Sequence, residues 1–521
     1  MDQGPNRGGA ISPPVLDPGS CPALLPAAFP GRPHPSWPGW PKVFSSGLEI
    51  GLAARRGKTL PRTHAKREHV SDSNRPISYL PTDGLSYDPA EPKYWEPEAL
   101  AKEVTRAFEI CHGCRMCFKY CDSFPTLFDA IDRRHDGDVR KLEAAETEAV
   151  MDDCFQCKLC EVQCPYTPRD KHDFQLDFPK LVHRYKAQRH RREGASLRDK
   201  LLADPDRAGS LARASLGMAN VMNRVSAHRF LMEKVLGVHR DKLLPEFASR
   251  TFERWAEERG LMAVDEPEVV LFQTCYVQNN EPQIGRDTVE VLEHNSVKVA
   301  CSKGLQCCGM PAWEIGDLET VRSRAKANLD RLSPHVEQGA KVLAIYPTCS
   351  MMLRREYKDL VAPEDKPRAE ALAKAVMDPS EFLWSIRNEE RFKTDFKSSP
   401  VGPEGGTVAY HAPCHLRAQG VGFRGRDLLR KLPGVQPQMT MECCGHDGTY
   451  AMKVESFEAS ARIGKKAFAG LAEANAEIWV TDCPLAALQF EQHADKKAMH
   501  PMSVLAKAYR GEAFRRPSAQ P

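Results

Sequence analysis

Two patterns of hydrophobic and polar residues follow one another along this chain, and the change falls near residue 266. Before it, apolar residues recur at the three- and four-residue spacing of an amphipathic helix. A helix is predicted to begin at Pro97, whose fixed φ suits a first turn, and to run up to Cys111. Its buried face is predicted to carry Leu100, Val104, Ala107 and Phe108.

The helical pattern continues beyond this first helix. The 32 residues between Cys121 and Cys154 are rich in Ala, Glu, Asp and Arg, most of which are compatible with helix. We therefore predict an all-helical domain over residues 76–180 and a helical basic connector over residues 181–265. The connector's core positions are predicted to be Leu211, Leu216, Met218, Val221, Met222, Val225, Leu231, Val235 and Leu236.

After residue 266, short β-branched runs alternate with helical stretches. The order strand–helix–strand–helix–strand occurs twice, which predicts two small α/β layers with parallel sheets. The fold class is therefore α+β and multidomain. The predicted strands are 269–272, 297–300, 342–346, 408–410 and 478–480. The predicted domains are 266–362 and 405–510, with a linker at 363–404 and a tail at 511–521.

Cysteines recur at matched places in the two α/β segments. Equivalent cysteines lie 134 to 139 positions apart, which indicates an internal duplication. They follow predicted strands, and sites in parallel sheets assemble at the carboxyl ends of strands. Each Cys-Cys pair is followed by a glycine, which leaves little side-chain bulk to oppose a cluster. Packing as small hydrophobes is the alternative. The candidate metal ligands are Cys275, Cys307, Cys308, Cys349, Cys414, Cys443, Cys444 and Cys483.

Two further cysteine runs share the spacing C-x2-C-x2-C-x3-C. That spacing is typical of bacterial [4Fe–4S] ligation, in which the fourth cysteine of each run binds the other cluster. A zinc site built from CxxC pairs is the alternative. We therefore predict two [4Fe–4S] clusters. The first would be held by Cys111, Cys114, Cys117 and Cys164, and the second by Cys154, Cys157, Cys160 and Cys121.

Composition limits the other possibilities. Eighteen cysteines grouped in this way favour metal ligation over a disulfide framework, and such sites need a reducing compartment, so we expect a cytoplasmic protein. A net charge of +3 in 521 residues gives no reason to expect nucleic acid binding. Residues 1–75 are rich in Pro and Gly and are predicted to be disordered or untranslated. The basic residues of 180–202 are interpreted as a solvated helix face, or as a docking face for an acidic partner or anionic lipid.

Three motifs of the second α/β segment carry a family resemblance: His411-Ala-Pro-Cys414-His415, Cys443-Cys444-Gly445-x-x-Gly448-Thr449-Tyr450, and Thr481-Asp482-Cys483-Pro484. With the two four-cysteine runs, the chain resembles iron–sulfur subunits that join a two-cluster ferredoxin domain to two CCG domains. These include the C subunit of anaerobic glycerol-3-phosphate dehydrogenase, the iron–sulfur subunits of glycolate and lactate oxidation, and heterodisulfide reductase. The resemblance covers about residues 95–510 and implies electron transfer.

The chain departs from the full CCG pattern, which ends in CxxC and supplies five thiolates. Here the endings are Cys349-Ser-Met-Met352 and Cys483-Pro-Leu-Ala486, so each copy has four cysteines. Each copy could still bind a further iron–sulfur cluster or zinc. The candidates to complete a site are Cys301, His411, His415, His446 and Asp482.

Our first functional hypothesis is an iron–sulfur electron-transfer subunit of an oxidoreductase, rather than the subunit that oxidises the substrate. It would relay electrons between a flavoprotein dehydrogenase, of the glycerol-3-phosphate or 2-hydroxy acid type, and a quinone or another carrier. No GxGxxG loop opening a helix, Walker loop or nucleophile elbow is found. The alternatives are a heterodisulfide or thiol–disulfide reductase, a rubrerythrin-linked electron donor, and a zinc-binding scaffold. A peripheral contact with the inner membrane face or a quinone also stays open.

Overall fold

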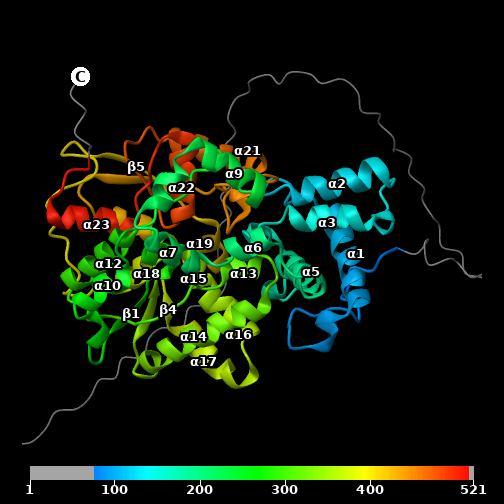
Figure 1. Ribbon diagram of the computed structural model, residues 1–521, viewed down its shortest axis with the longest axis horizontal. Helices are drawn as coiled ribbons and strands as arrows, with labels where there is room; N and C mark the ends of the chain where they lie inside the picture. Colours follow the sequence, from blue (N-terminus) through cyan, green and yellow to red (C-terminus); the bar gives the residue numbers. More distant parts are fainter. Residues whose placement is uncertain (1–75, 515–521) are drawn as a thin grey trace, which may run out of the picture. The chain divides into compact units, whose positions relative to one another are not determined.

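The computed structural model describes residues 76–514, and these residues combine helices with two parallel sheets (Figure 1). The predicted disordered segment 1–75 and most of the predicted tail lie outside the described residues. Within the described part of the chain, no helix is both long and apolar enough to cross a bilayer.

The two four-cysteine runs lie in a region that contains only helices and connecting loops. Its helices are α1 (Pro97–Cys114), α2 (Ser123–Arg134), α3 (Ala144–Asp152), α4 (Leu159–Gln163) and α5 (Phe178–Glu193). Helix α1 begins at Pro97 as predicted. Its four predicted apolar residues are buried, in a core shared with α2 and α5.

The connector forms helices, but the prediction that its apolar residues are core positions is wrong for most of them. The helices are α6 (Leu197–Leu202), α7 (Pro205–Ala214), α8 (Met218–Asn223), α9 (Ser226–Leu236) and α10 (Phe252–Glu258). Leu216 is 96% exposed and Val235 is 67% exposed. The helical spacing correctly predicted helices, but no other described residues cover the apolar face of α7–α9. The other exposed members are Leu211, Met218, Val221, Val225 and Leu231.

The basic segment 180–202 is a solvated face only in part. Arg191, Arg192 and Lys200 are exposed, whereas Arg184 and Lys186 are buried. The Arg184 guanidinium is buried and donates to the carbonyl oxygens of Gly84, Lys93 and Tyr94. Lys186 is also buried, and its Nζ donates to the Cys154 carbonyl oxygen at 2.7 Å. These cations instead satisfy backbone carbonyls that would otherwise be buried without donors.

The first sheet is parallel, with strand order β2-β1-β3-β4. Its strands are β1 (Val269–Phe272), β2 (Val299–Cys301), β3 (Lys341–Ala344) and β4 (Val376–Met377). Alternate residues of β1 enter two different cores: Val269 and Leu271 pack with α10 and α12, and Val270 and Phe272 with α13, α14 and α17. The sheet is therefore covered on both faces (Figure 1). The helices are α11 (Thr274–Asn279), α12 (Pro282–His294), α13 (Met310–Glu314), α14 (Leu318–Glu337), α15 (Pro347–Met351), α16 (Tyr357–Leu360), α17 (Lys366–Ala375) and α18 (Pro379–Ser385).

The second sheet repeats the first, with parallel order β6-β5-β7. Its strands are β5 (Gly406–His411), β6 (Val435–Thr440) and β7 (Trp479–Thr481). A parallel bridge from Val480 to Met499 stands where β4 pairs in the first copy. The helices are α19 (Cys414–Gln419), α20 (Arg424–Leu429), α21 (Phe457–Ala472), α22 (Pro484–Ala494) and α23 (Pro501–Arg510).

Two elements went unrecognised in the sequence. Strand β4 pairs with β3 and falls inside the segment 363–404, so the first α/β layer extends past residue 362 into the predicted linker. Strand β4 has only two residues, and β6 contains Pro437, so neither gives a β-branched run.

The glycine of the second Cys-Cys-Gly turn has a packing role that the sequence did not reveal. Gly445 has a φ of +78°, and a Cβ on it would lie 2.0 Å from the Ser460 carbonyl oxygen of α21. Its missing side chain therefore makes room for a helix, rather than for a cluster.

We predict that Gly445→Ala destabilises the protein by about 2–4 kcal/mol, because left-handed strain adds to overpacking. Gly339→Ala is the matched control, since Gly339 has a φ of +92° with open space around it. It should lose only about 1 kcal/mol. Thermal or urea unfolding measures both variants, and equal losses would contradict the packing role.

Candidate functional site

The two four-cysteine runs share one local geometry. In each, the residue after the second cysteine adopts a left-handed conformation: Arg115 has a φ of 55° and Lys158 a φ of 59°. Such a residue reverses the chain sharply, so the third sulfur returns toward the first two. Arg115 also ends α1, and its N–H donates to the Cys111 carbonyl oxygen at 2.8 Å.

The eight thiols form two groups that cross the two runs. The first group is Cys111, Cys114, Cys117 and Cys164, whose thiols lie close enough for one to raise the pKa of another. The second group is Cys121, Cys154, Cys157 and Cys160. The structure thus brings together the two sets predicted from the sequence. The groups are adjacent, because Cys117 Sγ lies 3.9 Å from the Cys160 carbonyl oxygen.

The four thiols of the second group are buried, and those of the first group are partly exposed. Burial, followed by the neighbouring thiols, raises the pKa of Cys160 well above its ordinary value, and that of Cys117 to about 12. A thiolate is the ligand form, so metal binding at these groups must release protons.

The donor set of both groups fits an iron–sulfur cluster. Each group gathers four thiols, the number of ligands that a [4Fe–4S] cluster takes, from runs with the spacing typical of such clusters.

The cysteines of the second α/β segment gather at the carboxyl ends of its strands. Cys414 opens α19 after β5, Cys443 and Cys444 follow β6, and Cys483 caps α22 after β7. Cys443 packs in the same core as the second thiol group. The Phe155 and Tyr450 rings, 4.8 Å apart between centroids, join the two regions.

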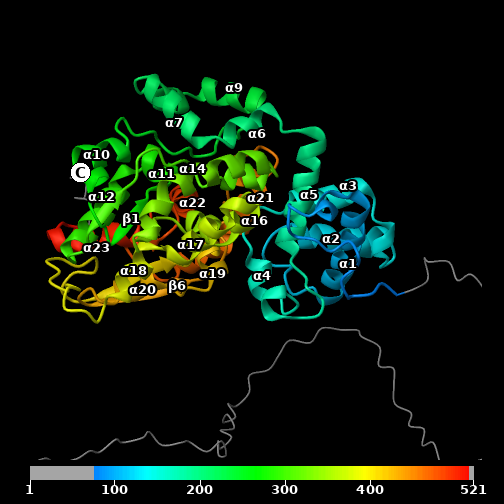
Figure 2. The same ribbon diagram turned by 90° about the horizontal axis from the view of Figure 1, so that it is seen from below.

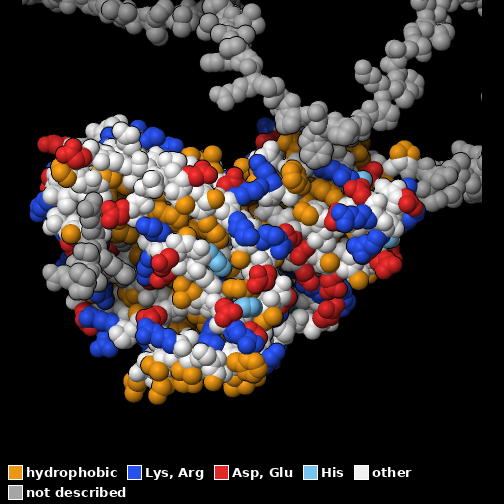
Figure 3. Space-filling model, turned by 90° about the horizontal axis from the view of Figure 1, so that it is seen from above, with side chains coloured by type: hydrophobic (Ala, Val, Ile, Leu, Met, Phe, Trp, Pro, Cys, Tyr) orange, Lys and Arg blue, Asp and Glu red, His pale blue; other side chains and the backbone are white. Residues whose placement is uncertain are grey.

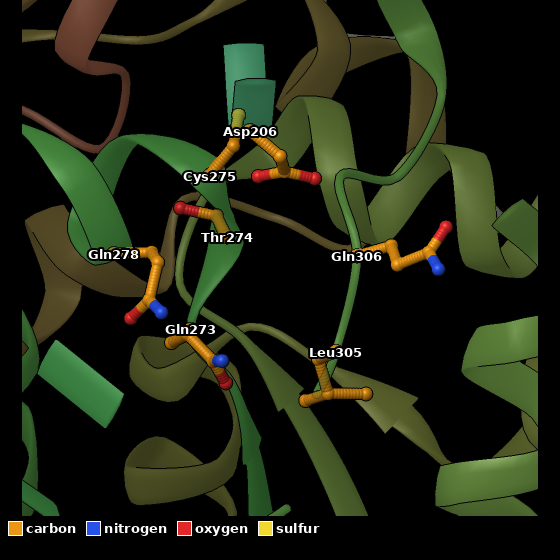
Figure 4. Close-up of a pocket in the computed structure, with 7 residues that line it drawn as sticks. All are labelled: Asp206, Gln273, Thr274, Cys275, Gln278, Leu305 and Gln306. Atoms are coloured by element: carbon orange, nitrogen blue, oxygen red, sulfur yellow. The ribbon is translucent and has the colours of Figure 1, made fainter. Parts of the chain in front are cut away.

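The first α/β segment brings its four cysteines together. The thiols lie close enough for Cys307 to raise the pKa of Cys275, and for Cys349 to raise that of Cys308. Thr274, just before Cys275, has a φ of 70°, which is strained for a β-branched residue. Asp206 of α7 lies beside Cys275 (Figure 4), and its Oδ2 accepts the Cys307 N–H at 2.7 Å.

Four of the five residues suggested to complete these sites are engaged elsewhere. Asp482 accepts from Tyr410 at 2.5 Å, and both His411 nitrogens contact protein oxygens at 3.1 Å. Cys301 packs in the core on the other face of the first sheet from Cys307 and Cys308. The fourth, His415, is held by contacts with two other regions.

His415 links three parts of the chain. Its Nε2 contacts the Gln156 carbonyl oxygen at 3.0 Å, and its Nδ1 contacts Thr348 Oγ1 at 2.9 Å. A carbonyl oxygen only accepts, so Nε2 carries the hydrogen. Burial lowers the pKa of His415 to about 4, so the ring is neutral at pH 7.

His446 and Asp447 differ from the others. Both nitrogens of His446 are buried and lack a hydrogen-bond partner among the described residues. Asp447 lies with Cys414 and His415 in a group of potential ligand atoms, all within 4.8 Å of one another. The sequence analysis missed Asp447, although its place three residues after Cys444 was a usable signal.

A glycine triplet with dinucleotide-loop spacing does occur, so the exclusion of a GxGxxG loop that opens a helix is wrong. Gly420, Gly422 and Gly425 lead into α20. Gly420 ends α19 with a φ of 70°, and a Cβ on Gly425 would lie 2.9 Å from Asp482. Helix α20 has six residues and follows a helix instead of a strand, so the triplet serves chain reversal and packing.

Comparison with known families supports the two kinds of cysteine site. Residues 110–167 match the 4Fe-4S dicluster domain family. Residues 269–354 and 408–491 each match the cysteine-rich CCG domain family.

Three relatives match parts of this chain. The C subunit of anaerobic glycerol-3-phosphate dehydrogenase from Escherichia coli is 29% identical over 316 residues, which cover 60% of this chain and 77% of that protein. Lactate utilization protein A of Shouchella clausii is 32% identical over 195 residues, or 36% of this chain and 75% of that protein. The B subunit of the Methanothermobacter marburgensis fumarate reductase (CoM/CoB) is 28% identical over 238 residues, which cover 45% of this chain and 44% of that protein.

We predict that Cys164→Ser and Cys111→Ser cause the same spectroscopic loss, whereas Cys154→Ser causes a different one. The reason is that Cys164 groups with the first run's sulfurs. Electron paramagnetic resonance of the reduced protein and iron counts per chain measure this. A Cys164→Ser spectrum that matches Cys154→Ser would contradict the crossed assignment.

Proposed function

This chain belongs to the family of CCG-domain iron–sulfur proteins, and we propose that it is the electron-transfer subunit of an oxidoreductase. It would pass electrons between a flavoprotein dehydrogenase, of the glycerol-3-phosphate or 2-hydroxy acid type, and a quinone or another carrier. Iron–sulfur clusters, when bound, supply one-electron exchange. The observation that carries the proposal is the contiguity of the four cysteine groups.

The four groups follow one another in space in a definite order. The first and second ferredoxin-type groups meet at Cys117 and Cys160. The second meets the second CCG group, because Cys157 and Cys443 are buried in the same core. The second CCG group meets the first where Thr348, beside Cys349, contacts His415, beside Cys414, at 2.9 Å. This order of the four cysteine groups supports a relay in series.

Both ends of the series reach the surface of the described unit. In the first group, Cys114 and Cys117 are partly exposed, with Phe118 60% exposed and Met116 44% exposed beside them. In the last group, Cys275 is partly exposed at the recess in Figure 4. Between them, Cys157, Cys443 and Cys444 are buried, while Cys414 and Cys483 of the second CCG group are partly exposed. We assign the flavoprotein to the Phe118 end and the other carrier to the Cys275 end.

The heterodisulfide reductase alternative has less support from the donor set. Each CCG domain supplies four thiols, and its ending lacks the fifth cysteine. No contact in the described residues favours a rubrerythrin partner over a dehydrogenase.

We further propose that the α7–α9 face binds an anionic membrane surface. Helices α7–α9 lie along one edge of the described unit (Figure 2), and hydrophobic side chains gather at one edge of the space-filling view (Figure 3). Arg207, Arg213 and Lys234 flank the face. The two acidic residues of the segment are engaged, since Asp206 accepts from Cys307 and Glu233 accepts from Arg240. An apolar face with basic flanks suits a peripheral contact with anionic lipid.

The functional test is anaerobic reduction of the reconstituted chain by a flavoprotein dehydrogenase and its substrate. We predict that Phe118→Glu lowers the bimolecular rate of reduction at least about tenfold, because the aromatic side chain that the flavoprotein would bury is lost. The iron content should stay constant. Leu231→Glu, on the α7–α9 face, is the control and should keep the rate. An unchanged rate in Phe118→Glu, or an equal loss in both variants, would contradict the assigned end.

The membrane test uses vesicles of phosphatidylcholine with and without phosphatidylglycerol. We predict that binding needs the anionic lipid, weakens with salt, and falls at least about tenfold in Leu231→Glu/Val235→Glu, because two apolar side chains no longer enter the interface. Phe118→Glu is the control and should bind as the unaltered chain does. If the double variant binds vesicles normally but loses a protein partner, the face is a protein interface and the membrane proposal is wrong.

A further inference from the structure

Asp447 is a buried carboxyl group that the protein leaves half unsatisfied. Its side chain is 2% exposed, in the loop that follows Cys443 and Cys444. Oδ1 accepts the Gly448 N–H at 2.9 Å. Oδ2 has no hydrogen-bond donor among the described residues.

The nearest candidate donor is directed elsewhere. His415 Nε2 lies 3.2 Å from Asp447 Oδ2, but its N–H is directed at the Gln156 carbonyl oxygen. The opposite nitrogen of the ring is held by Thr348. The histidine is therefore fixed from both sides and leaves Oδ2 free.

A second carboxyl group makes the position of Asp447 still less favourable. Glu314, from α13 of the first α/β segment, is buried, and a Cβ on Gly448, the residue after Asp447, would lie 1.8 Å from Glu314 Oε2. Glu314 Oε2 accepts the Thr449 N–H at 3.0 Å, so it is held in place. The nearby cation Lys158 is paired with Glu356 at 2.5 Å, so two buried acidic groups with one unpaired oxygen remain costly.

The cysteines of the second CCG group lie near Asp447. Cys414 Sγ lies within 4.8 Å of an Asp447 carboxylate oxygen, and Cys443 and Cys444 precede Asp447 in the same loop. After burial, the charges of Cys444 and Asp447 raise the pKa of the Cys483 thiol. Asp482 is the contrasting case: it is also buried and adjacent to Cys483, but it has hydroxyl contacts from Tyr410 and Ser380.

We propose that Asp447 is a metal ligand of the second CCG domain and supplies an oxygen donor beside Cys414, Cys443, Cys444 and Cys483. Buried carboxylates without hydrogen-bond partners are stable when they coordinate a metal. The chain lacks the fifth cysteine of the full CCG pattern, and Asp447 offers a fifth donor from a different position in the sequence. The proposal deepens the proposed function, because it assumes that this group holds an iron–sulfur cluster.

The experiment compares Asp447→Asn, Asp447→Cys and Asp482→Asn in the full-length chain after anaerobic reconstitution. Iron and sulfide per chain, Mössbauer and electron paramagnetic resonance spectra, and the rate of iron loss to a chelator are measured. We expect Asp447→Asn to change the spectrum of one cluster and to speed its loss at least about tenfold. Asp447→Cys should restore slow loss with an altered spectrum, because a thiolate replaces the oxygen donor.

Asp482→Asn is the matched control and should behave as the unaltered chain does. If Asp447→Asn has unchanged iron content, spectra and chelator rate, Asp447 is not a ligand. If Asp447→Asn fails to fold, Asp447→Cys decides: stable cluster binding supports ligation, and loss of the cluster contradicts it. Electron transfer from a dehydrogenase is scored separately, so a chain that accepts no electrons refutes the proposed function without affecting the ligand result.

Discussion

The arrangement of the sites depends on one three-residue loop, Gln156–Lys158, which both α/β domains hold. Gln156 and Lys158, on either side of Cys157, both have left-handed backbone conformations. The Gln156 carbonyl oxygen accepts from His415 of the second CCG domain, and Lys158 Nζ pairs with Glu356 of the first at 2.5 Å. Both partners of that pair are buried. Removal of one partner of such a pair typically costs about 3–5 kcal/mol, because an unpaired charge is left behind.

This loop lies in the buried junction where Cys157 meets the second CCG group. Lys158 Nζ also lies over the Trp313 ring, 5.0 Å from its centroid, and Trp313 stacks on His183 of α5. The cysteine groups therefore meet at a junction built from all three regions. Neither the helical region nor a single α/β domain could enclose Cys157 and Cys443 by itself.

Much of this fold could be predicted from local pattern, and the exceptions have physical causes. The α1 face and most strands followed periodicity, and the cysteine spacing anticipated which thiols gather. The apolar residues of α7–α9 have the same helical spacing as a core face, but spacing does not reveal whether a partner covers them. The basic residues Arg184 and Lys186 look like surface charge until the carbonyl groups that they satisfy are known. The place of Asp447 close after Cys444 is visible in the sequence, but its unpaired carboxylate oxygen is revealed only by the packed structure.

In the proposed relay, electrons reach the first CCG group through the second. Freeze-quench spectroscopy of Cys443→Ser, mixed with a reduced flavoprotein partner, tests it directly. The account predicts that the two ferredoxin-type clusters are reduced at the normal rate, while the signal assigned to the Cys275, Cys307, Cys308 and Cys349 group stays oxidised. Reduction of that group at the same rate in Cys443→Ser and in the unaltered chain would contradict the account.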